Sequence, residues 1–361
     1  MPDTDDGAGL PLRARQRMLA RLLDRGPRRP RELSGRSWWH ALRRTALEFW
    51  NDDLTDRAAA LTYYGIQSIF PGMLVLVSLL GLLGGGTTRE VLDNIEDMTP
   101  GPLREFLTTG IAGIRRDQGV AGVLAVVGVL VAFWSASSYI AAFMRAANAI
   151  YDVPEGRPLW KTLPIRILIT ALTGALLAAS ALTVIFTGRL AHWTGDLLGV
   201  SPRTVELFDV IKWPILVVAV ALLFDLLYWA APNARQGGWR WITPGTVLAV
   251  VVFVAVSAGF AFYVGQFGNY NKTYGTVGAV IVFLIWLWLS NVALLLGAEF
   301  DAELHRRRAI EAGLPADAEP YVLMRQAPGP ADEKAAAAEK AKREAARTPT
   351  VATEAVAERD D

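Results

Sequence analysis

Six apolar stretches constrain the fold of this chain more than any other feature of its sequence. They cover approximately residues 59–83, 120–143, 166–188, 211–231, 243–265 and 277–298. Each is close to the roughly 20 residues that an α-helix needs to cross about 30 Å of hydrocarbon. Six such segments are hard to accommodate in a water-soluble domain, and 52% of the 361 residues are hydrophobic. The sequence therefore predicts an all-α fold, a polytopic membrane helical bundle of about six transmembrane helices.

The distribution of lysine and arginine predicts the orientation of the bundle. With six spans the two ends of the chain share one side of the membrane. That side receives the Arg-rich N-terminus, the loop that contains Arg157 and Lys161, the loop that contains Arg235, and the basic run at 305–308. Because basic loops stay in the cytoplasm, we expect a multi-pass protein of the bacterial inner membrane with both termini cytoplasmic. No cleavable signal peptide is expected, since the first apolar stretch starts more than fifty residues into the chain.

The flanks of the membrane domain differ from it in composition. We expect residues 1–37 to form an Arg-rich, disordered cytoplasmic extension, residues 38–305 to form the six-span membrane domain, and residues 306–361 to form a charged, disordered cytoplasmic tail. Apolar residues at helical spacing predict amphipathic helices at 37–50 and 102–114.

A polar stripe runs into the first apolar stretch. Arg57, Tyr64 and Pro71 are seven residues apart, and Gln67 and Ser68 fall beside them on a helix. Because lipid offers no hydrogen bonds, such a stripe is expected to face the bundle interior or a wet cavity. Pro71 removes a backbone donor and predicts a kink in this helix.

Polar residues also interrupt three other spans. Ser138 and Arg145 lie in or just after the second span, Asp225 lies inside the fourth, and Asn291 and Glu299 lie in or just after the sixth. A lone buried charge is costly, so we expect Asp225 to pair with Arg145 or Arg57. Two interpretations stay open for the polar cluster: an interhelical network that orients the bundle, or a cavity open to the cytoplasm that binds a substrate, an ion or a headgroup.

Catalytic chemistry finds no support in the sequence. The chain has no cysteine, and its three histidines have no metal-ligand spacing. The motifs of zinc proteases, serine hydrolases, P-loop proteins and dinucleotide-binding proteins are absent from the sequence. We expect no catalytic residues, no bound metal, no cofactor and no nucleic-acid partner, and hence no enzyme.

Three segments carry a resemblance to a known family. They are "DRAAALTYYGIQSIFPGMLVLVSLLG", "RAANAIYDVPEGRPLWK" (145–161) and "YGTVGAVIVFLIWLWLSNVALLLGAEFDAEL" (274–304). In this order they resemble the YihY/BrkB family of bacterial inner-membrane proteins, over roughly residues 40–304. The resemblance implies a six-span protein with no settled biochemical activity. Members were formerly mislabelled ribonuclease BN, and others are linked to serum resistance or to envelope lipid export.

The resemblance and the polar cluster together favour a transporter-like or lipid- and envelope-handling component of the membrane. Its expected partners are membrane lipids and a small-molecule, ion or lipid substrate, and a homo-oligomer is left open. The alternative is a structural or scaffolding membrane protein without transport activity. A ribonuclease is not expected.

Overall fold

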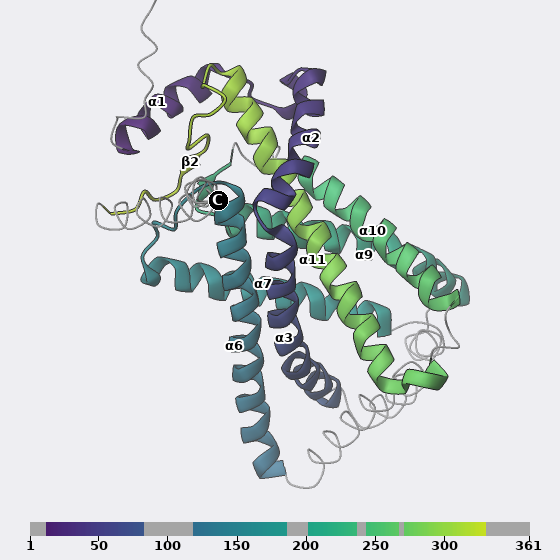
Figure 1. Ribbon diagram of the computed structural model, residues 1–361. Coiled ribbons are helices and arrows are strands. Elements are labelled where there is room, and N and C mark those ends of the chain that lie inside the picture. Colours follow the sequence, from purple (N-terminus) through teal and green to yellow (C-terminus); the bar gives the residue numbers. More distant parts are fainter. Residues whose placement is uncertain (1–11, 83–117, 186–200, 237–242, 267–270, 330–361) are drawn as a thin grey trace, which may run out of the picture.

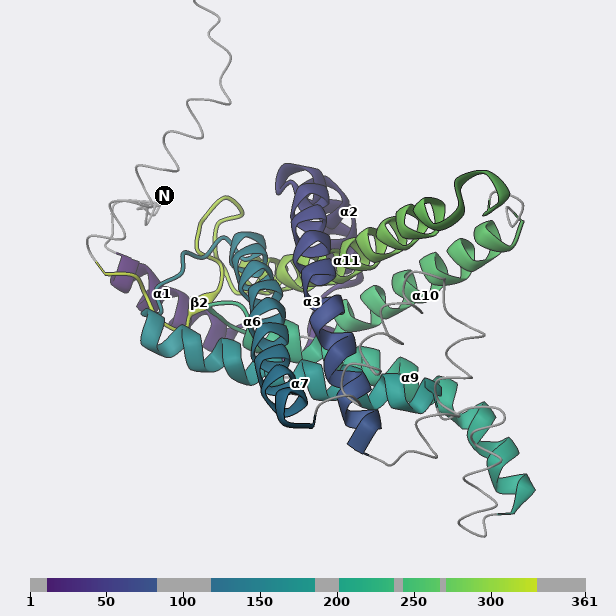
Figure 2. The same ribbon diagram turned by 90° about the horizontal axis from the view of Figure 1, so that it is seen from below.

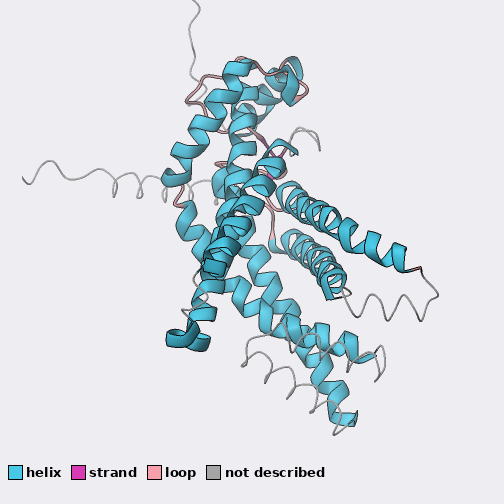
Figure 3. Ribbon diagram, turned by 90° about the vertical axis from the view of Figure 1, so that its right-hand side faces the viewer, coloured by secondary structure: helices cyan, strands magenta, loops and turns pink. Residues whose placement is uncertain are grey.

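The structure is a computed structural model that describes residues 12–82, 118–185, 201–236, 243–266 and 271–329. It confirms the all-α membrane bundle, and nearly all of the described chain is helical (Figure 3). The long helices are α3 (Leu54–Leu82), α6 (Gln118–Ile150), α7 (Leu159–Ile185), α9 (Pro202–Ala230), α10 (Thr243–Gln266) and α11 (Asn271–Glu311).

These six helices coincide with the six predicted apolar stretches as far as those are described. Within the described part of the chain, five helices contain a segment that is long and apolar enough to cross a membrane: Gly128–Ile150, Leu159–Val184, Leu207–Ala230, Pro244–Val264 and Val280–Glu311. The first predicted stretch is helical over the described part of 59–83. The chain is therefore a multi-pass membrane protein.

The long helices are arranged in chain order and close into a ring. Within the described residues each one contacts the next, from α3 through α6, α7, α9 and α10 to α11, and α11 returns to contact α3. Figure 2 shows α10 and α11 running side by side with α9 beside them. This closure brings the first and last spans together, although residues 83–270 separate them in the chain.

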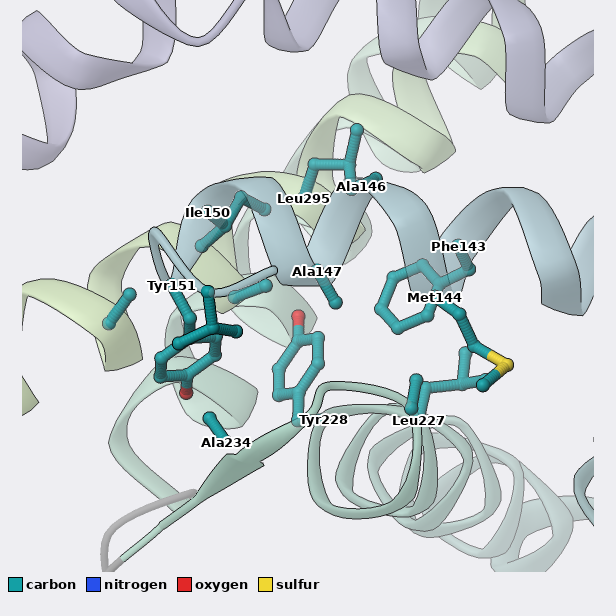
Figure 4. Close-up of a cluster of buried hydrophobic side chains, with 14 of the residues drawn as sticks. Phe143, Met144, Ala146, Ala147, Ile150, Tyr151, Leu227, Tyr228, Ala234 and Leu295 are labelled. Atoms are coloured by element: carbon teal, nitrogen blue, oxygen red, sulfur yellow. The ribbon is translucent and has the colours of Figure 1, made fainter. Parts of the chain in front are cut away.

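The core lies at one end of the bundle. Four large side chains are buried together there: Phe143 of α6, Tyr151 just after α6, Tyr228 of α9 and Leu295 of α11 (Figure 4). Large apolar side chains farther along the same helices are exposed, among them Trp134, Leu168, Val218, Val251 and Phe262. Exposed apolar faces of this extent fit a hydrocarbon surrounding, so the helices pack on one another at one end and face lipid over much of their remaining length.

Short elements cover the packed end, which we call the capped end. They are α1 (Leu12–Arg25), the 3-10 helix η2 (Pro30–Glu32), α2 (Gly35–Asn51), and the strands β1 (Ala234–Arg235) and β2 (Leu323–Met324), which pair antiparallel. The capped end also includes the loops 151–158 and 231–236 and the chain 312–329. Figure 1 shows α1, α2 and the last turns of α11 gathered at the top, with the helices spreading apart below.

The predicted amphipathic helix at 37–50 is present as α2. Its hydroxyl cap is Ser34, whose Oγ accepts a 3.1 Å hydrogen bond from the backbone nitrogen of Ser37. Trp39 and Trp50 are exposed, whereas Ala41 and Thr45 are buried on the opposite side, and α2 packs on α11. The exposed tryptophans suit the headgroup layer. The second predicted amphipathic helix, 102–114, lies outside the described residues.

The flanks are more ordered than the composition predicts. The expected solvated tail from residue 306 is wrong for its first part, because α11 continues to Glu311 and the chain then folds back with Tyr321, Val322 and Met324 buried. The expected disorder of 1–37 is likewise wrong for α1, where Leu19 and Leu23 are buried. In both flanks a few apolar residues are scattered among many charges, so the average composition hides them.

Candidate functional site

The polar stripe of α3 is satisfied largely within its own helix. The hydroxyl of Ser68 donates a 2.8 Å hydrogen bond to the carbonyl oxygen of Tyr64, and Gln67 Nε2 donates a 2.8 Å bond to the hydroxyl of Tyr63. Gln67 is exposed and Tyr64 is half-buried against the core. The predicted cavity along this stripe stays a prediction.

The two ends of the stripe add little to it. At the start, Arg57 Nε donates a 2.8 Å hydrogen bond to the carbonyl oxygen of Asp52, which orders the entry into α3. At the other end, Pro71 lies within α3, and its side chain and the expected kink lie outside what the structure describes.

Asn291 joins three spans by hydrogen bonds. Its Oδ1 accepts a 2.9 Å bond from the hydroxyl of Tyr139 on α6, and its Nδ2 donates a 3.0 Å bond to the hydroxyl of Thr62 on α3. Asn291 and Thr62 are buried. These bonds join α11 to α6 and α3 through Tyr139 and Thr62, two residues that the sequence analysis did not name, and both interpretations of the predicted polar cluster stay open.

The predicted ion pair of Asp225 is wrong. The Asp225 carboxylate accepts a hydrogen bond from the hydroxyl of Thr246 on α10, and no ion pair joins it to any described residue. Arg145 lies on an exposed face of α6, and Arg57 bonds the chain before α3. Asp225 therefore links α9 to α10, away from both arginines, and a neutral hydroxyl replaces the expected cation.

Ser138 belongs to the same outward side of the bundle as Arg145. Its hydroxyl donates a 3.2 Å hydrogen bond to the carbonyl oxygen of Trp134, one turn earlier on α6, and Trp134 itself is 72% exposed. Thus Ser138 and Arg145 are not brought together with Asp225, Asn291 and Glu299.

The densest group of buried polar side chains lies where α11 reaches the capped end. Glu299, Asp301 and Glu303 are 2%, 0% and 3% exposed; we call these three residues the acidic end of α11. Residues four apart share a helix face, and residues two apart do not. Glu299 and Glu303 therefore share one face of α11, and Asp301 lies on another. Both faces are buried because α1, α2, α3 and α10 pack around α11.

Glu299 and Glu303 form the first face. Glu303 Oε1 accepts a 2.9 Å hydrogen bond from Arg44 Nε of α2. The carboxyl groups of Asp52, Glu303, Glu48 and Asp152 all act on the charge of Glu299. Acids from α2, α11 and the chain next to α3 and α6 thus converge on Glu299, while Arg44 and Arg306 contact Glu303 (2.9 and 3.7 Å).

Asp301 forms the second face, toward α10. Its Oδ1 accepts a 2.7 Å hydrogen bond from the backbone nitrogen of Gly245. That contact requires the close approach of two helices, because a Cβ atom on Gly245 would lie 2.3 Å from the carbonyl oxygen of Gly297. On the same side, His305 Nδ1 lies 2.8 Å from the carbonyl oxygen of Asp301.

Each residue of the acidic end keeps one carboxyl oxygen without a hydrogen-bond partner among the described residues. These buried atoms are Glu299 Oε2, Asp301 Oδ2 and Glu303 Oε2. An unsatisfied buried polar atom costs about 1–3 kcal/mol, and more when it is charged. Such a cost at three sites within five residues of one helix favours a role in holding protons or a cation. The described residues include no group of three His, Asp or Glu arranged to hold a metal ion.

Asp52 connects this region to the surface of the capped end. Burial, together with the nearby carboxylates of Asp152 and Glu48, raises the pKa of Asp52 to about 7, against the lowering effect of the Arg57 charge. The carboxyl group of Asp52 therefore titrates near neutral pH, at the outer edge of the Glu299 face.

A second polar network fastens the capped end itself. The buried Asn233 donates through Nδ2 to the carbonyl oxygens of Pro154 (2.9 Å) and Gln326 (2.8 Å), and its Oδ1 accepts from the backbone nitrogen of Gln326 (3.1 Å). Its own backbone nitrogen donates a 2.7 Å bond to Asn148 Oδ1. Asn233 therefore ties together α6, the loops 151–158 and 231–236, and the returning C-terminal chain through its side chain and its backbone nitrogen.

Glu155 and Arg157 complete this network. Arg157 bonds both carboxyl oxygens of Glu155 (2.8 and 2.7 Å) and the carbonyl oxygen of Ala231 (2.8 Å). Burial alone would raise the pKa of Glu155, but the hydrogen bonds and charge of Arg157, with Asn148, hold it below its usual value. Gly156 allows this packing, because a Cβ atom there would lie 2.3 Å from the carbonyl oxygen of Gln326.

Sequence reasoning found Glu299 but missed Asp301 and Glu303. It ended the sixth span at residue 298 and named Glu299 as the one acid just after that span. The signal that could have found them is the alternation of acids at 299, 301 and 303 with Phe300, Ala302 and Leu304. Because this alternation puts apolar residues on every side of the helix, the helix has no wholly polar face to turn toward water, which predicts that it is buried on all sides.

The chain is similar to known bacterial proteins. The sequence profile of the family described as "Virulence factor BrkB" matches residues 45–321. The chain is 31% identical to a ribonuclease-like protein, YfkH, of Bacillus subtilis over 70% of this chain and 91% of that protein. It is 28% identical to a UPF0761 membrane protein of Stenotrophomonas maltophilia over 84% of this chain and 69% of that protein.

A UPF0761 membrane protein of Alkalilimnicola ehrlichii is 31% identical over 72% of this chain and 57% of its own length. No solved structure matches the chain. The matched region contains the membrane helices, Asn233 and the acidic end of α11. The chain therefore belongs to the BrkB family of membrane proteins.

Proposed function

We propose that the protein is a transporter-like, lipid- or envelope-handling component of the bacterial inner membrane whose work depends on protonation of the acidic end of α11. The observation that carries this proposal is the presence of three buried carboxyl groups, each with one unpartnered oxygen, at alternate positions of the last span. Buried acids of this kind within spans are typical of ion and proton pathways. If these carboxyl groups had no such role, apolar residues at the same three positions would give a more stable helix bundle, because buried charges are costly to desolvate.

The capped end supplies the route for protons. Asp52 lies at its edge, half-exposed, with a pKa of about 7. The charged groups that act on Glu299 are the carboxyl groups of Asp52, Glu303, Glu48 and Asp152. Of the arginines next to these acids, Arg44 and Arg306 contact Glu303, and Arg57 bonds the carbonyl oxygen of Asp52. A proton can thus pass from solvent at Asp52 to Glu299 without crossing the apolar part of the bundle.

We propose that the capped end is cytoplasmic and that both termini lie on that side. Basic side chains gather there, including Arg157, Lys161, Arg235, Arg306 and Arg325. Basic segments next to spans remain in the cytoplasm. The same orientation exposes Asp52 to the cytoplasm.

The alternative is a scaffolding protein in which the polar groups only hold the bundle together. The network of Asn291 with Tyr139 and Thr62 favours this alternative for that part of the molecule, since every group in it has a partner. The acidic end of α11 does not fit it, because its carboxyl groups are incompletely satisfied. The name of the Bacillus relative contains the word ribonuclease, and the described residues offer no metal-binding group that supports such an activity here.

Infrared spectroscopy of the reconstituted protein separates the two functions. The band of protonated carboxyl groups is recorded while the pH is raised from about 5 to about 9, a range that brackets the titration of many buried carboxyl groups. Wild type is expected to lose a component of this band that Glu299→Gln lacks throughout. The exposed Asp317 provides the control, Asp317→Asn, which keeps the component. Two results support the scaffold instead. In the first, the component that Glu299→Gln removes is present in wild type but does not change with pH. In the second, wild type and Glu299→Gln give the same band.

A further inference from the structure

Two buried acids from different spans meet at the start of α10. Asp225 of α9 is 7% exposed and Asp301 of α11 is 0% exposed; we call these two residues the acid pair. Asp301 Oδ1 accepts the 2.7 Å hydrogen bond from the backbone nitrogen of Gly245, and Asp225 accepts the hydrogen bond from the hydroxyl of Thr246. Gly245 and Thr246 are consecutive residues in the first turn of α10. The carboxyl groups of α9 and α11 are therefore held at adjacent positions of one helix end.

These hydrogen bonds set an upper limit to the distance between the two carboxyl groups. The two bonds and the stretch of chain between their donors together span about 12 Å at most. At that distance, and at an effective dielectric constant of about 20, two negative charges change each other's proton affinity by about tenfold. A shorter distance gives a larger effect, and the charge of Asp225 does act on Asp301. The two acids therefore titrate as a pair and not independently.

No basic side chain compensates the acid pair among the described residues. Its two members form hydrogen bonds there but no ion pair, and α10 has no charged residue between Thr243 and Gln266. Asp301 Oδ2 is buried and has no hydrogen-bond partner in the described part of the chain. The positive end of the α10 dipole offsets only part of two negative charges. A further positive charge is therefore expected at this place.

The other titratable groups around the acid pair do not supply that charge. They are Tyr228 of α9, Tyr151 after α6, His305 of α11, and Glu299 on the other face of α11. Tyrosine is uncharged at neutral pH, and the hydroxyl of Tyr228 donates its 2.6 Å hydrogen bond to a backbone carbonyl oxygen of α11. His305 Nδ1 lies 2.8 Å from the backbone carbonyl oxygen of Asp301, a contact that the N–H of a neutral imidazole makes.

We propose that Asp225 and Asp301 bind one proton between them and form a proton-binding site at the joint of α9, α10 and α11. The protonated carboxyl group keeps an acceptor oxygen for its bond to α10, and the proton removes one of the two charges. Loss of this proton leaves two like charges at the first turn of α10, which weakens the packing of the three spans. The inference rests on the proposed function, because Asp301 belongs to the acidic end of α11. It adds a second proton, separate from that of Glu299, and gives Asp225 a role.

Infrared spectroscopy of the reconstituted full-length protein in a Glu299→Gln background tests the acid pair. The band of protonated carboxyl groups is recorded from about pH 4 to about pH 10, a range that covers most buried carboxyl groups. A component that disappears as the pH rises is expected to remain in this background. Adding Asp225→Asn removes the neighbouring charge, so the proton affinity of the remaining acid is expected to fall by about tenfold or more. Adding Asp301→Asn instead has the same effect on Asp225, and the triple variant lacks the component.

Matched variants keep this test decisive. Asparagine retains the acceptor oxygen for the bonds to Gly245 and Thr246, so the substitutions remove charge and keep the contacts with α10. Asp209→Asn is the control, because Asp209 lies on the same helix as Asp225, about four turns away, and pairs with Lys212 at 2.9 Å. It is expected to leave the titration unchanged.

Three results overturn the proposal. In the first, no component in the Glu299→Gln background responds to either asparagine substitution. In the second, Asp301→Asn removes the component but Asp225→Asn leaves its titration unchanged, so that the two acids are independent. In the third, the component is present in choline chloride and missing in sodium chloride, which assigns the site to Na⁺ instead of a proton. None of these results bears on Glu299, because all the variants compared lack its carboxyl group.

Discussion

Gly297 of α11 and Gly245 of α10 are in backbone contact: a Cβ atom on Gly297 would lie 2.5 Å from the carbonyl oxygen of Gly245 and 2.5 Å from the hydroxyl of Tyr228. Small residues allow such close helix crossings in membranes. The crossing also places the backbone nitrogen of Gly245 within 2.7 Å of Asp301 Oδ1. The geometry of the acidic end of α11 therefore depends on two glycines.

Gly297→Ala is expected to destabilise the protein by about 1–3 kcal/mol, the usual cost of overpacking a close contact. Gly174→Ala is the matched control, because a Cβ atom on Gly174 of α7 has no neighbour within 4 Å and alanine favours the helix. Thermal melting in detergent measures both. Melting of Gly297→Ala at or above the temperature of Gly174→Ala would show that the two helices do not cross this closely.

Asn233→Ala is expected to release the C-terminal chain from the capped end. The substitution removes three hydrogen bonds and leaves buried groups of Pro154 and Gln326 without partners, at a cost of about 1–3 kcal/mol for each unsatisfied group. Arg325, which bonds the carbonyl oxygens of Ala234 and Trp229 in the folded protein, then becomes accessible. Limited trypsin digestion measures cleavage after Arg325. Unchanged protection of this bond in the variant would contradict the network.

The titration of Asp52 predicts a pH dependence of stability. Its pKa is about 7 in the folded protein and 3.8 as a free side chain, so between these values the folded state holds a proton that the unfolded state has released. Stability from this group is therefore greatest at low pH and falls as the pH rises toward 7. Asp52→Asn is expected to lack this fall and to be more stable than wild type at about pH 8.

The adjacent Asp53 provides the control for this experiment. It is exposed and has a φ of 51°, which asparagine also tolerates. Asp53→Asn is expected to follow the pH profile of wild type. If Asp52→Asn and wild type lose stability in parallel as the pH rises, the carboxyl group of Asp52 does not titrate in this range.

Cysteine labelling tests the orientation. The chain has no cysteine, so single cysteines at positions 20, 100 and 340 give unambiguous signals. With an impermeant thiol reagent applied to intact cells, we expect labelling at position 100 and protection at positions 20 and 340, because the basic loops stay inside. Disrupted cells should label at all three positions. Labelling of intact cells at 340 and not at 100 would reverse the orientation.

The sequence was sufficient for the positions of the long helices because span length and hydropathy are local properties. It was also sufficient for α2, whose apolar face repeats at helical spacing. It failed for the partner of Asp225, since hydrogen bonding to Thr246 depends on which faces of α9 and α10 meet. It failed for Asp301, because the close approach of Gly245 and Gly297 is a property of the packed helices and not of either helix alone. The order of residues 312–329 was missed for a similar reason, since Asn233 reaches that chain only in the folded protein.

Lipid movement across a bilayer tests the central claim most directly. Purified protein is reconstituted into vesicles that contain fluorescently labelled phosphatidylglycerol, and a membrane-impermeant quencher reports how fast the label changes leaflet, with and without an imposed pH gradient. The account predicts that wild type accelerates the exchange over protein-free vesicles and that the gradient changes the rate, whereas Glu299→Gln loses the response to the gradient. The account would be contradicted if the label changed leaflet no faster in vesicles with wild type than in protein-free vesicles, with or without the gradient. That result would favour the scaffolding alternative.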